Sequence, residues 1–115
     1  MDYLFKKIKP KEADVTKEIR SYLKLRGIWH YKQWQGMGSL PGVADIIGIW
    51  KGRYLAIEVK RPGGKVTELQ QNFLDRVNIE GGIGFVAYSV EDVMENLPKE
   101  VLDVDFFLQL RRKNV

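Results

Sequence analysis

The chain has 115 residues, of which 44% are hydrophobic and 30% charged, a composition that supports a packed core and excludes a wholly disordered protein. It has no cysteine, which excludes disulfide frameworks, thiolate zinc sites and cysteine nucleophiles. No apolar run reaches the ~18 residues of a membrane span, and residues 1–11 lack the apolar segment of a secretory leader. We therefore expect an intracellular, cytoplasmic protein without membrane contact.

The net charge of +4 is modest, but the basic residues are clustered along the chain. One cluster lies near each end, and a third lies in the middle at Lys60, Arg61 and Lys65. Clustered basic residues attract a phosphate backbone, although many basic domains bind no nucleic acid. Charge alone leaves both interpretations open.

Hydrophobic periodicity and turn residues divide the chain into a series of predicted elements. In chain order these are a helix over residues 11–26, a strand over 28–34, a loop over 35–42, a β-hairpin of strands 45–50 and 53–60, a helix over 67–80, a strand over 83–88 and a helix over 89–97. Val15, Ile19 and Leu23 share one face of the first helix. Thr67 and Gln70 are spaced as a capping box at the start of the second.

Residues 1–115 are predicted to form one domain, since no repeat, low-complexity tract or linker divides them. The core spans residues 11–97, and its mixture of strands with crossover helices favours an α/β sandwich. The tail, residues 98–115, carries recurring apolar residues. We expect this tail to pack on the domain or on a partner chain.

The second strand of the hairpin places an acid and a base on one face. Side chains alternate along a strand, so Leu55, Ile57 and Val59 point together toward a predicted core. Glu58 and Lys60 then point to the opposite face. A carboxylate and an ammonium therefore lie side by side in a strand that should be central.

The turn of the hairpin sets which residues face each other. With Lys51-Gly52 as a two-residue loop, Trp50 pairs with Arg53, and Asp45 lies opposite Glu58. Directly opposed residues have Cβ atoms about 4.5–5.5 Å apart, where like charges are destabilising. A divalent cation with oxygen ligands would offset this repulsion. Ordinary surface salt bridges would explain the same residues equally well.

Lys60 adds a chemical function to the two carboxylates. A cation held by Asp45 and Glu58 would lower the pKa of a bound water and neutralise a phosphate oxygen. A lysine beside it could orient or deprotonate that water, or stabilise the charge at phosphorus. The residue types therefore suit metal-dependent phosphodiester hydrolysis.

The sequence around these residues resembles a known nuclease signature. GVAD at residues 42–45 and EVK at residues 58–60, in the pattern D-x12-E-x-K, are similar to the motif of the PD-(D/E)XK nuclease superfamily. More narrowly, GVADIIGIWKGRYLAIEVKRPGGKVTELQQNFL resembles the small stand-alone VRR-NUC domains of phages and bacteria, and the likeness extends from about Glu12 to Val93. The motif proline is Ala44 here, and we expect the alanine to be tolerated because proline supplies no chemistry.

The resemblance implies a restriction-endonuclease-like α/β fold, an αβββαβ core with a mixed central sheet flanked by helices. It also implies a Mg²⁺-dependent (or Mn²⁺-dependent) endodeoxyribonuclease, bacterial or phage-encoded. Asp45 and Glu58 match the metal-binding acids, Val59 the residue whose backbone carbonyl joins the metal, and Lys60 the catalytic lysine. Gln70 matches a glutamine that supports the site or touches the scissile phosphate, and its role in helix capping is an equal alternative.

The family also places a metal-binding glutamate on the first helix, for which this chain offers Glu12 and Glu18. On a helical projection, Glu12 lies roughly 40° and Glu18 about 80° from the centre of the apolar stripe. We favour Glu12 because it points further inward. Its alternative role is that of an acidic residue in the first helical turn, where the dipole favours negative charge.

Five residues are predicted to contact nucleic acid. Trp34 lies beside the glycine-rich loop and could stack on a base. Lys51, Arg53, Arg61 and Lys65 are predicted to flank the carboxylates and to hold the phosphate backbone. For each of the four taken singly, a solvated surface charge is a nearly equal alternative.

By analogy with the family, the expected substrate is DNA, in particular branched DNA such as a four-way junction. The expected assembly is a homodimer, which would offer two active sites to two strands. The main alternative is a non-catalytic nucleic-acid-binding module with the same fold, which would bind DNA without metal. A structural or interaction protein, the remaining alternative, would show no strong salt-dependent affinity for DNA.

Overall fold

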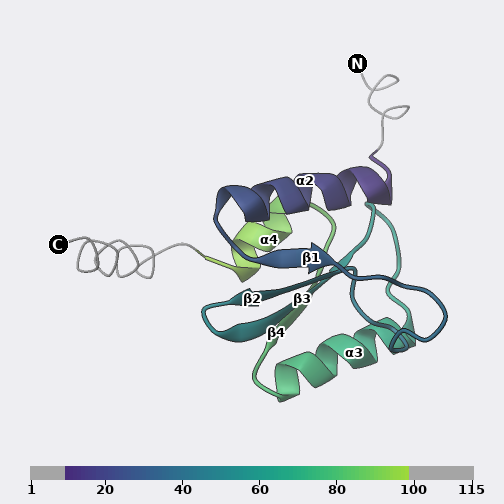
Figure 1. Ribbon diagram of the computed structural model, residues 1–115. Coiled ribbons are helices and arrows are strands. Elements are labelled where there is room, and N and C mark those ends of the chain that lie inside the picture. The colour runs from purple at the N-terminus through teal and green to yellow at the C-terminus, as the bar shows by residue number, and fades with distance from the viewer. Residues whose placement is uncertain (1–9, 99–115) are drawn as a thin grey trace.

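The computed structural model describes residues 10–98, which form a sheet between helices (Figure 1). The elements are α2 (Glu12–Leu25), β1 (His30–Lys32), β2 (Ile46–Trp50), β3 (Arg53–Val59), α3 (Glu68–Ile79), β4 (Ile83–Ala87) and α4 (Val90–Asn96). This order confirms the predicted αβββαβ core. The predicted packing of the tail falls, apart from residue 98, outside the described residues.

The central sheet is mixed, as predicted, with the strand order β1-β2-β3-β4. The pairs β1–β2 and β2–β3 are antiparallel, whereas β4 runs parallel to β3. Two parallel neighbours need a crossover connection, and α3 supplies it. The sheet therefore has β1 as an open edge, with β3 in its interior.

Helices cover both faces of the sheet (Figure 1). Leu55, Ile57 and Val59 of β3 are buried in one hydrophobic cluster with residues of α2 and α4, which confirms the predicted core face. The opposite face of β3 is also covered, because Ala56 is buried with residues of α3. Glu58 lies on this second face, and burial on both faces explains why so polar a residue is 2% exposed.

The hairpin has the predicted register. Trp50 pairs with Arg53 and Ile46 pairs with Ile57 across β2 and β3. Lys51 and Gly52 both have positive φ, 51° and 77°, as a two-residue type I′ turn requires. Continuing this register by one residue beyond the ladder sets Asp45 opposite Glu58.

The first strand is shorter than predicted, His30–Lys32 instead of residues 28–34. The N–H of Ile28 donates to the carbonyl of Leu23 at 2.9 Å, so Ile28 completes the C-terminal turn of α2 and does not pair with β2. The N–H of Gln33 donates to the carbonyl of Asp45 at 2.7 Å. This bond ties the chain after β1 to the residue just before β2.

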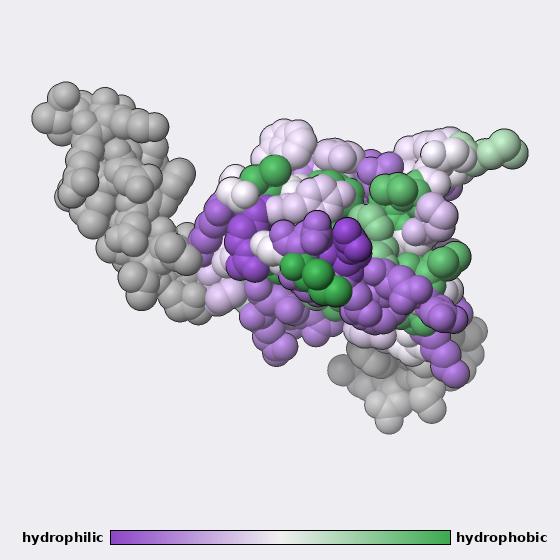
Figure 2. Space-filling model, turned by 90° about the horizontal axis from the view of Figure 1, so that it is seen from below, coloured by the Kyte–Doolittle hydropathy of each residue, from purple (hydrophilic) through white to green (hydrophobic). Residues whose placement is uncertain are grey.

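The surface around α3 shows hydrophobic residues scattered among hydrophilic ones (Figure 2). On the face of the sheet that carries α3, an aromatic patch lies toward the hairpin turn and the β1 edge. Its members, all more than a third exposed, are Trp29, Tyr31, Ile49 and Tyr54. The Trp29 and Tyr31 rings meet edge to face, with centroids 5.6 Å apart.

Within residues 10–98, no helix is long and apolar enough to cross a membrane.

Candidate active site

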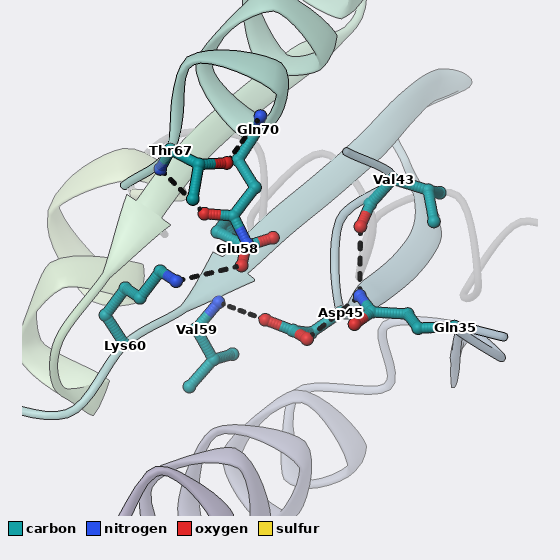
Figure 3. A network of polar contacts seen from close by, with 8 residues as sticks. All are labelled: Gln35, Val43, Asp45, Glu58, Val59, Lys60, Thr67 and Gln70. Atoms are coloured by element: carbon teal, nitrogen blue, oxygen red, sulfur yellow. Dashed lines mark hydrogen bonds and ion pairs between the residues drawn. The ribbon is translucent and has the colours of Figure 1, made fainter. Parts of the chain in front are cut away.

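Asp45 is held over the end of β3 by two hydrogen bonds (Figure 3). Its Oδ2 accepts from the backbone N–H of Val59 at 2.7 Å, and its Oδ1 accepts from Nε2 of Gln35 at 3.0 Å. The same Nε2 donates to the carbonyl of Val43 at 2.9 Å. The carboxylate is therefore fixed beside Glu58 by groups on two separate segments, the end of β3 and the loop that contains Gln35.

Glu58 is a buried acid with incomplete compensation. Its Oε1 lies 3.8 Å from Nζ of Lys60, whereas its Oε2 is buried and, when Glu58 is ionised, has no hydrogen-bond donor among residues 10–98. Burial raises the pKa of Glu58 to about 8, and Asp45 adds to the rise through its charge and by accepting a hydrogen bond from the protonated acid; Lys60 lowers the pKa, and Glu12 raises it. A buried acceptor without a partner is costly, so this site is suited to a ligand that supplies positive charge.

A divalent cation fits this donor set. Two carboxylates meet where one ammonium is the only close positive charge among residues 10–98, and oxygen donors are what Mg²⁺ prefers. In that part of the chain, no group of three or more His, Asp or Glu side chains lies together as a complete metal cluster. Asp45 and Glu58 therefore form the centre of the candidate site, and further ligands to a cation would have to come from the backbone, water or another side chain.

Glu12 lies near this pair, at the start of α2. It lines one hollow together with Asp45 and another together with Lys60, and its charge contributes to the raised pKa of Glu58. Glu18 is exposed further along α2 and lines neither hollow. Of the two glutamates considered from the sequence, Glu12 is the one that the fold brings toward the carboxylates.

Two hollows open beside the carboxylates and contain three of the predicted DNA contacts. We call the first, which includes Trp34 and Asp45, the Trp34 hollow. The second, which includes Lys60, Arg61 and Lys65, is the Lys60 hollow. Trp34 is 63% exposed, so its ring is accessible to a ligand. The fold therefore gathers Trp34, Arg61 and Lys65 around the site.

The expectation that Lys51 and Arg53 flank the carboxylates is corrected by the hairpin register. Both residues lie at the turn end of the hairpin, roughly 20 Å along β3 from Val59 at ~3.3 Å per residue. Arg53 donates to the carbonyls of Gly81 and Gly82, at 2.9 and 3.2 Å. Nζ of Lys51 lies 3.9 Å from the centre of the Trp50 ring. Their contact with DNA stays a prediction, but at a distance from the site.

Gln70 caps α3. Its Oε1 accepts from the N–H of Thr67 at 2.9 Å, and Thr67 Oγ1 accepts from the N–H of Gln70 at 3.2 Å. In Figure 3 the Gln70 side chain points from the start of α3 toward Glu58. The capping interpretation is confirmed, and contact between Gln70 and a scissile phosphate stays a prediction.

Gln35 is a positioning residue that the sequence did not reveal. It lies in a loop ten residues before Asp45, and neither helical nor strand periodicity links the two positions. Only the folded path of residues 35–42, which returns the chain to β2, brings its amide to the carboxylate. No spacing signal in the sequence could have identified it.

Gly42 fixes this loop against α3. Its φ is +73°, and a Cβ there would lie 2.2 Å from the carbonyl oxygen of Leu69. We expect Gly42→Ala to lower the free energy of unfolding by about 2–4 kcal/mol, since it combines left-handed backbone strain with overpacking. Gly38→Ala in the same loop is the matched control, because Gly38 also has positive φ but no atom within 4 Å of the added Cβ. Urea denaturation of both variants measures the difference, and equal losses would contradict the packing argument.

The chain matches known proteins in sequence and fold. The family model described as "VRR-NUC domain" matches residues 9–91. A solved structure titled "VRR_NUC domain protein" superimposes with a TM-score of 0.62 at 21% identity, covering 76% of this chain and 84% of that chain. No curated protein matches the sequence. At this identity the solved structure supports the fold, and the family model covers the segment that carries Asp45, Glu58 and Lys60.

Proposed function

Because this chain belongs to the VRR-NUC domain family, a group of nucleases within the PD-(D/E)XK superfamily, we propose that it is a Mg²⁺-dependent endodeoxyribonuclease. The observation that carries the proposal is the buried, partly unpartnered carboxylate of Glu58 between Asp45 and Lys60. A site with this arrangement has little structural purpose, since a buried acid beside another acid destabilises the metal-free fold.

The residues that would hold the cation are Asp45 and Glu58 through their carboxylates, Val59 through its backbone carbonyl, and Glu12. Asp45 already has both oxygens oriented by hydrogen bonds, so it would be preorganised as a ligand. When bound, Mg²⁺ (or Mn²⁺) neutralises phosphate charge and lowers the pKa of a coordinated water. Glu12 is exposed and would have to turn inward to join the set.

Lys60 would act on the reacting groups. Its ammonium lies 3.8 Å from Glu58 Oε1, so it is fixed at the edge of the carboxylate pair. From there it would orient the attacking water and stabilise the negative charge that develops on the phosphate. Water attacks phosphorus, the bond from phosphorus to the 3′ oxygen breaks, and the leaving oxygen takes up a proton.

DNA is the proposed substrate, and branched DNA the proposed preference. A domain of 115 residues offers little surface around a duplex, so a second copy would be needed to engage two strands. The aromatic patch supports a homodimer, because exposed apolar groups gathered at a sheet edge favour contact with another protein surface.

The mass in solution tests the proposed homodimer: we expect twice 13.3 kDa for the wild type and a monomer for Ile49→Asp. Leu25→Asp, at an exposed position on α2, is the control; a monomeric wild type would overturn the dimer.

A non-catalytic DNA-binding module with the same fold is the alternative. It would keep the basic hollows and the aromatic residues but would have no use for Asp45, Glu58 and Lys60. The complete set of these three residues at one end of the sheet favours the enzyme.

The proposal is tested by cleavage of labelled four-way junction, flap and linear duplex DNA in Mg²⁺, Mn²⁺ or EDTA. We expect cutting with either cation, none in EDTA, and the fastest rate on the junction. Equal rates on all three substrates would contradict the preference for branched DNA but would leave the nuclease activity supported. If the protein binds DNA without metal and never cuts it, the nuclease proposal is wrong and the non-catalytic binding module is supported.

A further inference from the structure

A basic groove lies between α2 and the edge strand β1. It encloses about 320 Å³, and its charged lining residues are Lys17, Arg20, Lys24 and Lys32. No carboxylate lines it, and the remaining lining residues are small or hydroxylated. We call this feature the α2 groove. It is separate from the Lys60 hollow and includes none of the residues predicted from the sequence to contact DNA.

The groove joins two parts of the chain that only the fold brings together. Lys17, Arg20 and Lys24 recur at helical spacing along one face of α2, away from the buried stripe of Val15 and Ile19. Lys32 comes from β1, the open edge of the sheet. Four positive charges thus line one surface hollow.

These charges have no acidic partners among residues 10–98. The ion pairs in that part of the chain are Lys60–Glu58 and Arg76–Glu80, and neither involves the groove. Arg20 and Lys24 are spaced i, i+4, where like charges destabilise a helix. In addition, Nε of Arg20 is buried and has no hydrogen-bond partner in the part of the chain that the structure describes. The groove therefore has free donors and uncompensated charge, which an anion would satisfy.

The groove continues into the active site. Lys32 lines both the α2 groove and the Trp34 hollow, which contains Asp45. On the other side of Glu12 lies the Lys60 hollow, so basic residues are present on both sides of the carboxylates. At 1.5 Å per helical residue, Lys24 lies about 18 Å from Glu12 along α2, a length of about five base pairs of duplex.

We propose that the α2 groove binds backbone phosphates of the DNA on one side of the scissile bond, within about five nucleotides of it. This inference rests on the proposed function, since it takes DNA as the substrate. The groove holds the flank of the substrate, and Asp45, Glu58 and Lys60 perform the cleavage.

The test measures DNA binding by Lys17→Ala/Lys24→Ala in EDTA. Both side chains are exposed and alanine favours helix, so the fold should persist. We expect the affinity for a labelled duplex to fall about tenfold at 100 mM salt, and the slope of log K against log salt to fall by about two. Arg76→Glu on α3 is the control: it changes net charge by the same amount at an exposed site outside the groove. An equal loss in the control would overturn the groove, because binding would then follow net charge.

Cleavage separates this inference from the proposed function. With Mg²⁺, we expect Lys17→Ala/Lys24→Ala to raise KM about tenfold with little change in kcat. This defect should shrink as the substrate is shortened below five nucleotides on one side of the cut. If the wild type cuts DNA and the variant has the same KM, the proposed role of the groove is wrong and the nuclease activity is supported. If the wild type binds DNA through the groove but never cuts it, the proposed nuclease activity is wrong and the proposed DNA binding by the groove is supported.

Discussion

Asp45→Asn is expected to lower the single-turnover rate of DNA cleavage by about 10³-fold while leaving the fold intact. Asparagine keeps one side-chain oxygen that can accept from the N–H of Val59, so this bond to the end of β3 is retained, whereas the bond from Gln35 is lost. It removes the negative charge that would bind the cation. The expected loss is therefore mainly one of metal binding and catalysis, with a decrease in unfolding free energy of only about 1 kcal/mol from the missing Gln35 bond.

Asp75→Asn is the matched control for Asp45→Asn. Asp75 lies on α3, accepts a hydrogen bond from Gln71 at 2.8 Å, and lines neither of the two hollows beside the carboxylates. We expect this variant to cut at the wild-type rate. Titration of Mn²⁺ against both variants should show weakened binding in Asp45→Asn alone. Cleavage by Asp45→Asn at more than a tenth of the wild-type rate would remove Asp45 from the metal site.

Glu58→Gln is expected to abolish cleavage and, without divalent cations, to stabilise the protein. At pH 8.5 in EDTA we expect the midpoint of thermal unfolding to rise by about 4–8 °C, the shift that ~1 kcal/mol produces in a domain of this size. The reason is burial, which raises the pKa of Glu58 from 4.5 to about 8, with a further contribution from the Asp45 carboxylate. Glutamine removes the charge that the folded protein must bury at this pH.

The sign of the pH dependence follows from this shift. Between pH 4.5 and about 8, the folded wild type keeps the proton that the unfolded chain has lost, so its stability falls as pH rises. Glu58→Gln has no such proton, and its advantage should grow over this interval and level off above it. Thermal scans in EDTA across the interval measure the difference. Parallel curves for the two proteins would contradict the assignment.

Mg²⁺ should reverse the order of thermal stability, so that the wild type becomes more stable than Glu58→Gln. At pH 8.5, above the raised pKa of Glu58, the wild type should be stabilised by Mg²⁺ through preferential binding to the folded state. Glu58→Gln should gain little. Glu80→Gln, which alters an exposed acid paired with Arg76 on α3, should behave as the wild type in both conditions. This control excludes a general effect of removing a negative charge.

The centre of the site could be predicted from the sequence because the rules that govern it are local. A two-residue turn at Lys51-Gly52 fixes the hairpin register, and strand alternation then determines which side chains face each other. These two rules are sufficient to place Asp45 opposite Glu58. Likewise, the spacing of Thr67 and Gln70 predicted the start of α3, because a capping box lies within one turn of helix.

The surroundings of the site depend on contacts between distant segments and could not be predicted in this way. Gln35 reaches Asp45 only through the folded loop, and Lys32 meets Lys17 only when β1 packs beside α2. Lys51 and Arg53 show the reverse error. They are close in sequence to the motif, but an extended strand carries them away from it.

The burial of Glu58 also follows from tertiary structure. Alternation along β3 predicted one core face but did not reveal that α3 covers the other. Because the second face is covered, Glu58 is 2% exposed and its pKa is raised, which is the physical basis for the cation binding that we propose. The crossover between the parallel strands β3 and β4 thus creates the electrostatics of the site as well as the topology of the sheet.

The most direct test of a nuclease site at Asp45, Glu58 and Lys60 is the cleavage rate of a labelled four-way junction by the wild type and by Lys60→Ala. Arg76→Ala is the control, since Arg76 is exposed on α3. With Mg²⁺ we expect the wild type and Arg76→Ala to cut at equal rates, and Lys60→Ala to lose about 10²–10⁴-fold. Cleavage by Lys60→Ala at the wild-type rate, or a wild type that never cuts, would contradict the proposed site.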